Sequence, residues 1–445
     1  MNNLIKKYDI KGPRYTSYPP VPFWNGAPNE QTWLSHIERS YDENEGIDLY
    51  IHIPYCEKLC YYCGCNRTIS KNKKLSTIYT EMILDEWSLY KRKLSIDLKI
   101  RSIHFGGGTP TFLSPLDFEN LLGELSEFFT TDFKGSIEID PRTCKEEHLQ
   151  VLKKYSINRI SMGIQDFDPQ VQKIINREQS FELVEKLVCQ MRDCGFESIN
   201  FDLIYGLPGQ TTQTISDTID QVIKLDPDMI AFYSYAHLPE RIKNQKLLPN
   251  DLIPFGDKKR ELYEIGKEKL INSSMEEIGL DHFAKKSNYL CKVKREGKLL
   301  RNFMGYTDKK SSVLLGLGVT SISNTPFSFA QNEKEIKEYK HALEEGVLPL
   351  FHGHIQSQYD QLIERIIQDI MCNEKANFEE ISEYPHIDKV LFELDQMQKD
   401  GLLLLETMAK KIKVLPRGRT FLRNIAMCFD SYLRERKENN FSRTI

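Results

Sequence analysis

Four cysteines lie within ten residues near the start of the chain, in the run Cys56-Glu-Lys-Leu-Cys60-Tyr-Tyr-Cys63-Gly-Cys65. The first three follow the spacing C-x3-C-x2-C, which allows one loop to wrap around three corners of a [4Fe–4S] cluster, because thiolates are the usual ligands of such clusters. Three protein ligands leave the fourth iron open, and an open iron can bind and reduce a small molecule. The run therefore indicates redox chemistry at an open iron.

Zinc is the alternative metal, because thiolates bind zinc as well as iron. Structural zinc sites usually draw on two separated C-x2-C pairs, and this chain has no second pair. The single-residue step from Cys63 to Cys65 is tight for two corners of one cluster, so we expect Cys65 to lie near the site without ligating it. The other six cysteines are scattered, as is typical of buried thiols in a reduced, intracellular protein.

The elements that must position these cysteines form a repeated pattern of strand, loop and helix. Amphipathic stretches such as 116–129 and 214–225, with apolar residues at helical spacing, separate short runs rich in β-branched residues. A strand followed by a helix, repeated six times, predicts a parallel sheet with right-handed crossovers. The six predicted strands are 47–54, 100–105, 136–140, 157–164, 198–205 and 229–235.

Polar or glycine-rich residues stand at the end of each predicted strand. The cysteine run follows the first strand, Gly106-Gly107-Gly108-Thr109-Pro110 the second, and Glu138, Gln165, Asp202 and Ala236 lie at or near the ends of the others. In barrels of alternating strands and helices the active site is built from these carboxyl ends. We therefore predict an α/β fold with an open or partial (β/α)6 barrel; a doubly wound sheet is the alternative.

The ends of the chain differ from this repeat. Residues 1–40 are rich in proline and tyrosine around Gly12–Pro20, and we expect an N-terminal arm over the active site, with packing on the surface as the alternative. Residues 41–345 form the predicted catalytic domain. Residues 346–445 form a small, mainly helical accessory domain, with helical patterns at 358–371 and 392–399, a hairpin at 402–414 and a helix from Gly418 to about Lys437.

Composition sets the outer limits. The chain has 445 residues and a nearly balanced charge, with 60 Lys and Arg against 64 Asp and Glu, so no basic surface for nucleic acid is expected. The first residues lack the apolar segment of a signal peptide, and no apolar run of about 18 residues predicts a membrane span. We expect a cytoplasmic protein.

Cys56-x3-Cys60-x2-Cys63 with the downstream GGGTP resembles the radical S-adenosylmethionine (SAM) superfamily. Within it, the chain is similar almost end to end to the family of oxygen-independent coproporphyrinogen III oxidases. The matching stretches are PRYTSYP (13–19), LYIHIPYCEKLCYYCGCN (49–66), HFGGGTPTFL (104–113), EIDPR (138–142), SMGIQDF (161–167), NREQ (176–179), FDLIYGLPGQ (201–210), DHFA (281–284), RNF (301–303), GYT (305–307) and RNIAMCFDSYLR (423–434). Cys65 favours this family, because the related haem chaperones and many paralogues have an aromatic residue there.

The resemblance implies a [4Fe–4S] cluster held by Cys56, Cys60 and Cys63, with one SAM on the open iron and a second SAM nearby. Positions that match the contacts of the first SAM are Tyr50, Gly107, Glu138 and Ile322. Positions that match the contacts of the second are Tyr62, Gly108, Thr109, Gln165, Arg177, Asp202 and Ala236. The substrate of this family carries four carboxylates, for which Arg14 is a candidate clamp.

The resemblance also implies the reaction. A one-electron donor such as a flavodoxin reduces the cluster, and a 5′-deoxyadenosyl radical removes hydrogen from the β-carbon of a propionate, which then loses carbon dioxide. Two such steps turn coproporphyrinogen III into protoporphyrinogen IX in haem biosynthesis, and we expect the enzyme to act as a monomer. The alternatives are a haem-binding or haem-delivery paralogue, an enzyme for another tetrapyrrole, and an electron-transfer or structural cluster protein.

One position departs from the family pattern. The family usually reads RNFQGYT where this chain has Met304 in place of the glutamine. A thioether cannot make the hydrogen bonds of an amide. If that amide orders a ligand, the substitution predicts slower catalysis or a shift toward another tetrapyrrole.

Overall fold

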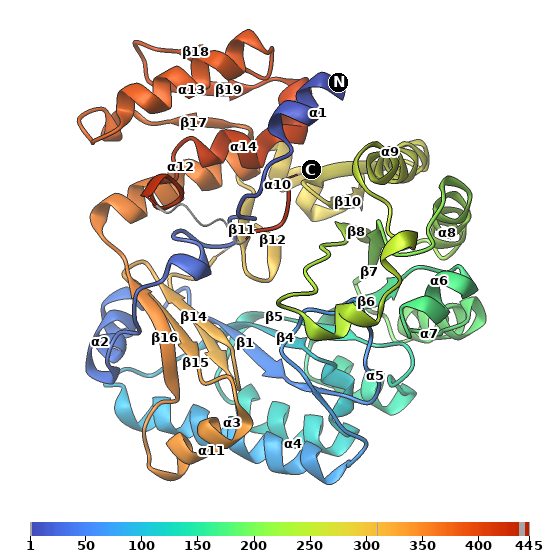
Figure 1. The fold of residues 1–445 in the computed structure, drawn as a ribbon. Coiled ribbons are helices and arrows are strands. Elements are labelled where there is room, and N and C mark those ends of the chain that lie inside the picture. Colours follow the sequence, from blue (N-terminus) through green and yellow to red (C-terminus); the bar gives the residue numbers. More distant parts are fainter. Residues whose placement is uncertain (1, 309, 436–440, 445) are drawn as a thin grey trace.

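A computed structural model of the chain describes residues 2–308, 310–435 and 441–444. At its centre six parallel strands lie side by side in the order of the sequence (Figure 1). A doubly wound sheet would reverse its strand order in the middle, so the alternative prediction is wrong and the partial barrel is confirmed. The strands are β1 (Ile47–Ile53), β4 (Ile100–Gly107), β5 (Phe129–Ile139), β6 (Ile157–Gln165), β7 (Ser198–Tyr205) and β8 (Met229–Ser234).

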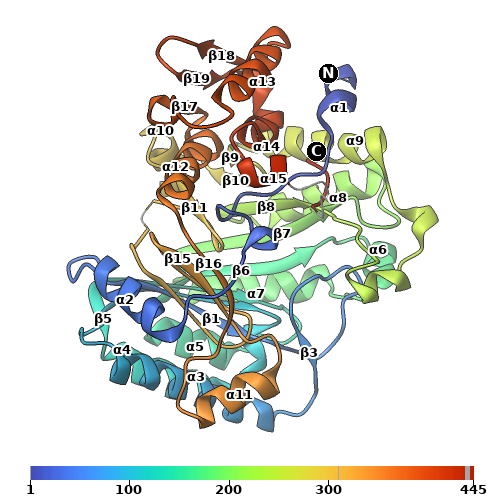
Figure 2. The same ribbon diagram turned by 60° about the vertical axis from the view of Figure 1, so that its left-hand side comes forward.

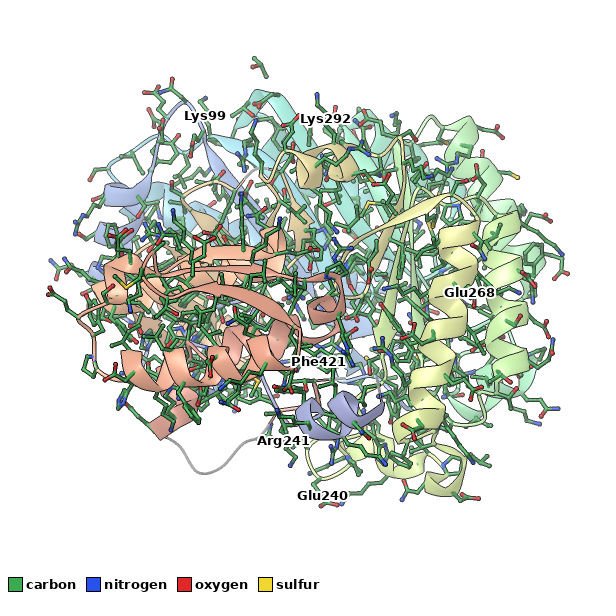
Figure 3. All side chains as sticks on the ribbon, turned by 90° about the horizontal axis from the view of Figure 1, so that it is seen from above. Lys99, Glu240, Arg241, Glu268, Lys292 and Phe421 are labelled. Atoms are coloured by element: carbon green, nitrogen blue, oxygen red, sulfur yellow. The ribbon has the colours of Figure 1, made fainter. Side chains whose placement is uncertain are left out.

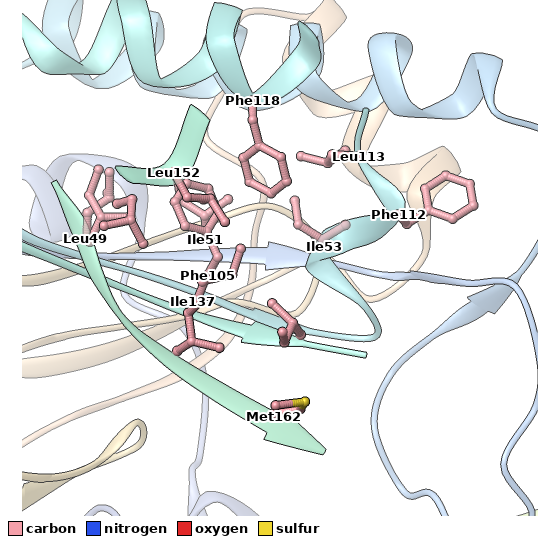
Figure 4. Close-up of a cluster of buried hydrophobic side chains, with 14 of the residues drawn as sticks. Leu49, Ile51, Ile53, Phe105, Phe112, Leu113, Phe118, Ile137, Leu152 and Met162 are labelled. Carbon is pink, nitrogen blue, oxygen red and sulfur yellow. The ribbon is translucent and has the colours of Figure 1, made fainter. Parts of the chain in front are cut away.

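The outer face of these strands is apolar and is covered by helices (Figures 1 and 2). Because strand side chains alternate between the two faces, every second residue of β1 points outward; these are Leu49, Ile51 and Ile53, all fully buried. They share one core with Phe105 and Phe118 (Figure 4). Full burial of each such side chain stabilises the fold by about 1.5–3 kcal/mol.

The outer helices begin at side-chain caps that the sequence supplies. The Ser114 and Ser180 hydroxyls accept hydrogen bonds from backbone N–H groups in the first turns of α4 and α7, which satisfies otherwise unpaired donors. The helices are α3 (Lys74–Lys93), α4 (Pro115–Ser126), α5 (Glu146–Lys154), α6 (Pro169–Ile174), α7 (Phe181–Asp193), α8 (Thr212–Lys224) and α9 (Gly256–Asn272).

The sheet extends beyond the six predicted strands on both sides and remains open, with twelve strands among the described residues. Strand β13 (Leu314–Leu317) pairs in parallel with β1, and the antiparallel strands β14 (Ile322–Thr325), β15 (Ser328–Asn332) and β16 (Leu350–Ile355) follow it. On the other side β8 pairs with β10 (His282–Lys285), and β10 with β9 (Met275–Gly279). The main sheet thus continues past residue 345, and the division into domains stays a prediction.

Shorter elements complete this part of the chain. The small helix α11 (Ile336–Glu344) separates β15 from β16, and α10 (Tyr289–Arg295) precedes a hairpin of β11 (Leu300–Asn302) and β12 (Gly305–Thr307). The cysteine loop lies between β2 (Tyr55–Cys56) and β3 (Thr68–Ile69), and single turns of 3-10 helix occur at Pro110–Phe112, Lys243–Leu247 and Asn250–Leu252.

The C-terminal region contains helices and a small three-stranded sheet. Helices α12 (Gln358–Asn373) and α13 (Ile387–Lys399) confirm the two helical patterns, and β18 (Leu403–Glu406) with β19 (Lys411–Val414) forms the expected hairpin, to which β17 (Lys375–Asn377) adds. The expected single helix from Gly418 is wrong. The chain forms a 3-10 helix (Pro416–Phe421), then α14 (Leu422–Met427) and α15 (Ser431–Glu435), and residues 436 and 437 lie outside the described residues.

The break before α15 has a local cause. Asp430 is fully buried, and its carboxylate accepts the backbone N–H of Leu433 at 3.1 Å, which caps a new helix instead of continuing the old one. Asp430 also accepts a hydrogen bond from the Tyr15 hydroxyl at 2.9 Å. The N-terminal arm therefore specifies where this helix starts.

The N-terminal arm packs against the C-terminal region. It contains α1 (Asn2–Tyr8), a 3-10 turn (Val21–Phe23) and α2 (Glu30–Ser40). The Tyr8 ring lies 5.3 Å from the ring of Phe421, which Figure 3 labels beside the arm, and Arg423 donates to the carbonyl of Pro13 at 2.9 Å. Residues 2–40 do not line the main cavity described below, so a position over the active site stays a prediction.

Glu86 of α3 is a fully buried carboxylate that joins three elements. Its Oε2 accepts the N–H of Gly318 at 2.8 Å and the hydroxyl of Tyr339 at 2.5 Å, and its Oε1 accepts the amide of Asn332 at 2.6 Å. These bonds hold the turn after β13 and helix α11 against α3. Burial raises the pKa of Glu86 from 4.5 to about 7, although the three hydrogen bonds oppose this shift.

The raised pKa of Glu86 predicts a specific pH dependence of stability. The folded chain binds this proton more tightly than the unfolded chain, so the folded state loses stability as pH rises from about 4.5 to about 7. The loss is about 3 kcal/mol over this range. We expect Glu86→Gln to flatten the difference in free energy of unfolding between pH 5 and pH 8, measured by urea denaturation, whereas Glu81→Gln on the exposed side of the same helix should keep it. An unchanged difference in Glu86→Gln would contradict the prediction.

Among the described residues, helices are too short or too polar to cross a membrane.

Candidate active site

The inner face of five of the six strands carries polar side chains, which is unusual for a barrel. The interior of a closed (β/α)8 barrel is filled with branched apolar side chains. Here the positions that alternate with the outward-facing residues carry polar groups and line a cavity of about 490 Å³. They include Asp48, Ser102, His104, Lys134, Ser136, Glu138, Arg159, Ser161, Gln165, Ser198, Asn200 and Asp202. The open barrel therefore encloses a polar binding cavity instead of a packed core.

Most of the predicted site residues line this one cavity. The residues in its wall are Cys56, Cys60, Tyr62, Cys63, Cys65, Gly107, Gly108, Thr109, Glu138, Gln165, Arg177, Asp202 and Met304. Tyr50, Ala236 and Ile322 are outside this set, as is the candidate clamp Arg14, which pairs with Asp281 at 3.2 Å. Tyr50 stacks on the wall residue His104 with ring centroids 6.0 Å apart, and Ala236 accepts a hydrogen bond from Gln245 through its carbonyl at 3.1 Å. Ile322 begins strand β14, beside the turn that Glu86 holds.

Amide side chains hold the cysteine loop in place. Asn244 donates to the carbonyls of Tyr61 at 2.8 Å and Cys63 at 3.0 Å, and Gln245 donates to the carbonyl of Tyr62 at 2.9 Å. Both amides come from the 3-10 turn that follows β8, far along the chain from the loop. Nothing in the sequence singles them out, because their role depends on which segment folds against the loop.

Two arginines lie beside the thiol of Cys60. The Nη2 of Arg142 lies 3.7 Å and the Nη1 of Arg177 lies 3.6 Å from this sulfur. Both guanidinium groups pair with the buried Asp140, at 2.6 Å and 3.0 Å. Burial acts to raise the pKa of Asp140, but the two arginines outweigh it and hold this pKa well below its usual range. Two positive charges therefore lie beside the sulfur of Cys60.

The thiols of the loop have different environments. Burial raises the pKa of Cys56 to about 11, although the Thr109 hydroxyl donates to its sulfur at 3.2 Å. A hydrogen bond from Cys65 lowers the pKa of Cys63 to about 6. Cys65 itself is exposed and borders the same cavity. Through this contact with Cys63, Cys65 can influence the site without being one of the three predicted cluster ligands.

These features fit an iron–sulfur cluster better than zinc. Three thiols border one cavity, and two cations lie beside one of them. Arg142 Nη1 and Arg177 Nε are buried without a hydrogen-bond partner among the described residues, so the site has unused donors for an anionic group. Among the described residues, His, Cys, Asp and Glu side chains nowhere gather in threes around a point that could hold a single metal ion.

The glycine loop after β4 brings its backbone close to the cysteine loop. Gly107 has a φ of +117°, and a Cβ there would lie 2.8 Å from the imidazole of His52. A Cβ on Gly108 would lie 3.0 Å from the carbonyl of Pro54. Because no side chain fits at either position, the backbone itself forms this part of the cavity wall.

Carboxylates occupy the middle of the cavity. Glu138 keeps 46% of its side chain exposed and lies 3.5 Å from the Nε2 of His104. Asp202 accepts the Ser161 hydroxyl at 2.7 Å and the Asn200 amide at 3.0 Å. Burial, with the nearby charge of Glu138, raises the pKa of Asp202 to about 7. Both carboxyls can therefore bind hydroxyl or ammonium groups of a ligand.

Serine, asparagine and histidine side chains in this part of the cavity were not predicted. Ser161, Asn200 and His104 complete the hydrogen bonds of the carboxylates and of Ser136, whose hydroxyl lies 2.7 Å from the Nδ1 of His104. The sequence does contain a sign of them. In INRISMGIQ the alternating residues from 159 to 165, and in SINFDLIY those from 198 to 202, are small or polar, which predicts strands with one polar face.

Gln165 and Arg177 approach each other where β6 ends. Gln165 has a φ of +67°, and Arg177 donates to the carbonyl of Gly163 at 2.6 Å. A Cβ on Gly163 would lie 2.8 Å from the amide of Gln165 and 2.9 Å from the guanidinium of Arg177. Gly163 thus leaves the space that these two side chains occupy.

Known proteins resemble the chain over nearly its whole length. The profile of the Radical SAM superfamily matches residues 50–222. The oxygen-independent coproporphyrinogen III oxidase of Pseudomonas aeruginosa is 38% identical, over 100% of this chain and 98% of the relative, and that of Escherichia coli is 37% identical, over 99% and 98%. A solved structure of the coproporphyrinogen III oxidase HemN from Escherichia coli, described as a radical SAM enzyme, superposes with a TM-score of 0.88 at 35% identity, covering 97% of this chain and 98% of that one. The chain therefore belongs to the family of oxygen-independent coproporphyrinogen III oxidases in the radical SAM superfamily.

Proposed function

We propose that this protein catalyses the oxygen-independent oxidative decarboxylation of two propionates of coproporphyrinogen III to vinyl groups, which yields protoporphyrinogen IX. Its full-length relatives are named oxygen-independent coproporphyrinogen III oxidases. The observation that supports it in this chain is the shared cavity. Cys56, Cys60 and Cys63 border the same space as a glycine loop and two carboxylates, and this space continues into a polar barrel large enough to accept a ligand.

Membership of the family implies a [4Fe–4S] cluster and SAM. We propose that Cys56, Cys60 and Cys63 hold the cluster, and that Arg142 and Arg177 balance its negative charge. When bound, these groups supply a one-electron reductive cleavage of SAM that generates a 5′-deoxyadenosyl radical. The protein contributes orientation and excludes water, because the reacting groups lie inside the barrel.

We propose two SAM molecules in this cavity. The carboxylate of Glu138 suits the ammonium group of the first, with Gly107 as its backbone wall and Tyr50 and Ile322 behind. Asp202 suits ribose hydroxyls of the second, since it already accepts hydroxyl and amide donors. Further proposed contacts of the second molecule are Tyr62, Gly108, Thr109, Gln165, Arg177 and Ala236.

We further propose a cytoplasmic monomer that receives its electron from a small carrier such as a flavodoxin. The cysteine loop is accessible to such a carrier, because Lys58 is 45% exposed and Gly64, Cys65 and Asn66 are exposed as well. A test is chemical crosslinking of the two proteins followed by identification of the linked lysine, with linkage at Lys58 expected.

The proposed reaction is tested under anaerobic conditions. The cluster is reconstituted, and reductant, SAM and coproporphyrinogen III are added. We expect both 5′-deoxyadenosine and protoporphyrinogen IX. Absence of 5′-deoxyadenosine would exclude radical chemistry, whereas 5′-deoxyadenosine without a vinyl product would exclude only the substrate. Haem uptake without any decarboxylation would instead indicate a haem-delivery protein.

Met304 offers a test of the cavity wall. It stands in the hairpin of β11 and β12, where its N–H donates to Asn302 at 2.9 Å, and it borders the cavity where the family has an amide. We expect Met304→Gln to raise kcat/KM for coproporphyrinogen III by about 2–10-fold, the effect of one added neutral hydrogen bond. Met408→Gln, at a residue 98% exposed in the C-terminal hairpin, is the control and should change nothing. An equal or lower rate in Met304→Gln would show that the amide is dispensable here.

A further inference from the structure

The main cavity has a second end, far from the cysteines. It continues along the barrel to the amino-terminal ends of the strands, where Arg101, Lys134, Arg159 and Ser198 border it. In the sheet, Arg159 of β6 lies opposite Ser136 of β5 and Ser198 of β7. It precedes Gln165, at the carboxyl end of the same strand, by six residues. At about 3.3 Å per residue this places Arg159 about 20 Å from Gln165 along β6. None of the predicted cluster or SAM contacts lies at this end.

Arg159 is held in place without an acidic partner. Its Nη1 donates to the hydroxyl of Tyr289 at 2.7 Å, and its guanidinium carbon lies 4.8 Å from the centre of the same ring. Among the described residues, Arg159 forms no ion pair. Arg101 differs, because Asp48 accepts two hydrogen bonds from it, at 2.9 and 3.0 Å. Arg101 is therefore directly paired with a carboxylate, whereas, in the described part of the chain, Arg159 is not.

The acids near this end do not change this picture. Asp48 is occupied by Arg101, by the Ser102 hydroxyl at 2.6 Å and by the N–H of Ser311 at 2.8 Å. Asp132 and Asp308 also border the cavity, and neither forms an ion pair with Arg159 among the described residues, although the charge of Asp308 acts on the same Tyr289. On the neighbouring strand, the exposed Lys134 adds a second positive charge on the same face. A partly buried guanidinium held by a phenol and facing a cavity is suited to bind a carboxylate in two-point contact.

We propose that Arg159, positioned by Tyr289, binds a propionate of the substrate that is not the one reacting near the cluster. This inference rests on the proposed function, because it takes coproporphyrinogen III as the ligand. The substrate carries four propionates, so when one reaches the reactive end the others must lie elsewhere in the cavity. Arg159 and Lys134 supply the counter-charge at the opposite end and so determine which way the substrate enters.

The test measures substrate binding separately from cofactor binding and turnover. Arg159→Gln removes the charge, Arg159→Lys keeps the charge without the planar pair of donors, and Tyr289→Phe keeps the ring without its hydroxyl. Anaerobic titration of the reconstituted enzyme with coproporphyrinogen III, followed by protein fluorescence, gives Kd; iron content and the Kd of SAM are measured alongside. Arg192→Gln, on the outside of the barrel where Arg192 pairs with Asp228 at 2.7 Å, is the matched control.

We expect the Kd for coproporphyrinogen III to rise about 10–100-fold in Arg159→Gln, as when one charged hydrogen-bonding partner is lost. Arg159→Lys and Tyr289→Phe should lie between this variant and wild type. Iron content and SAM affinity should stay at wild-type values in all of them. The same loss of affinity in Arg159→Gln is expected for the intermediate in which one propionate has already become a vinyl group. This tricarboxylate keeps the propionates that do not react first.

Two results would overturn the inference. One is an unchanged Kd for coproporphyrinogen III in Arg159→Gln while wild type forms product. The other is an equal loss of iron or SAM binding in all Arg159 variants, including Arg159→Lys, which would show a structural role. Failure of the proposed function is a different outcome, because wild type would then give no vinyl product and would not bind the substrate in the titration.

Discussion

Replacing Cys56 by alanine is expected to abolish the iron–sulfur cluster. Cys56 is the first thiol of the predicted set of three, it is buried, and the hydroxyl of Thr109 is directed at its sulfur. With two remaining ligands the loop can no longer hold a cluster against loss to solvent. After anaerobic reconstitution we expect iron and sulfide near zero, no broad absorbance in the visible range, and no cleavage of SAM.

Cys189→Ala is the matched control for this variant. Cys189 is an exposed cysteine on α7, on the outside of the barrel, and its loss should leave iron content and absorbance at wild-type values. Cys65→Ala adds information, because it should retain a cluster if Cys65 is not a ligand. An intact cluster in Cys56→Ala would overturn the proposed assignment of the three ligands.

Replacing Arg177 by methionine is expected to lower the free energy of unfolding substantially. Its side chain is 7% exposed and pairs with Asp140, which is 8% exposed. Removing one partner of a buried pair leaves an uncompensated charge, which lowers the free energy of unfolding by about 3 kcal/mol. The remaining pair of Asp140 with Arg142 keeps the loss from being larger. Urea denaturation of the reconstituted protein measures it.

Arg192→Met is the control for this second variant. Arg192 also forms one ion pair, but its side chain is 35% exposed, and such pairs contribute about 0–1 kcal/mol. We also expect Arg177→Met to bind SAM more weakly, because the same guanidinium borders the cavity and holds the end of β6 through Gly163. Equal stability of the two variants would show that the buried pair contributes no more than a surface pair.

The repeated elements were predictable because they depend on local pattern. Apolar runs rich in β-branched residues identified all six parallel strands, and the expected run 198–205 coincides with β7. Strand β5 begins at Phe129, within the expected helical stretch 116–129, because Phe129 pairs with Ile100 of β4. The split of the last helix was missed, since it depends on contacts of Asp430 with Tyr15 at the other end of the chain.

The added strands of the sheet were missed for a different reason. Strands β13, β14 and β15 are four or five residues long, and the segment that contains them has glycines that suggest turns. Strand β13 exists because β1 offers an open edge, to which it pairs over residues 48–51. A short segment of this kind becomes a strand only when a partner lies beside it.

The sequence by itself determined the chemistry of the site and the order of its elements. Spacing of thiols along one loop and polar residues at strand ends are local properties, so they can be read without a structure. Only the tertiary structure decided that Glu138, Asp202 and the thiols border one cavity and that Asn244 holds the cysteine loop. It also decided that Arg159 faces the same cavity with no ion pair to an acid among the described residues. These arrangements join residues far apart in the chain. They form only when the open sheet curves so that its inner face surrounds a cavity and not a packed core.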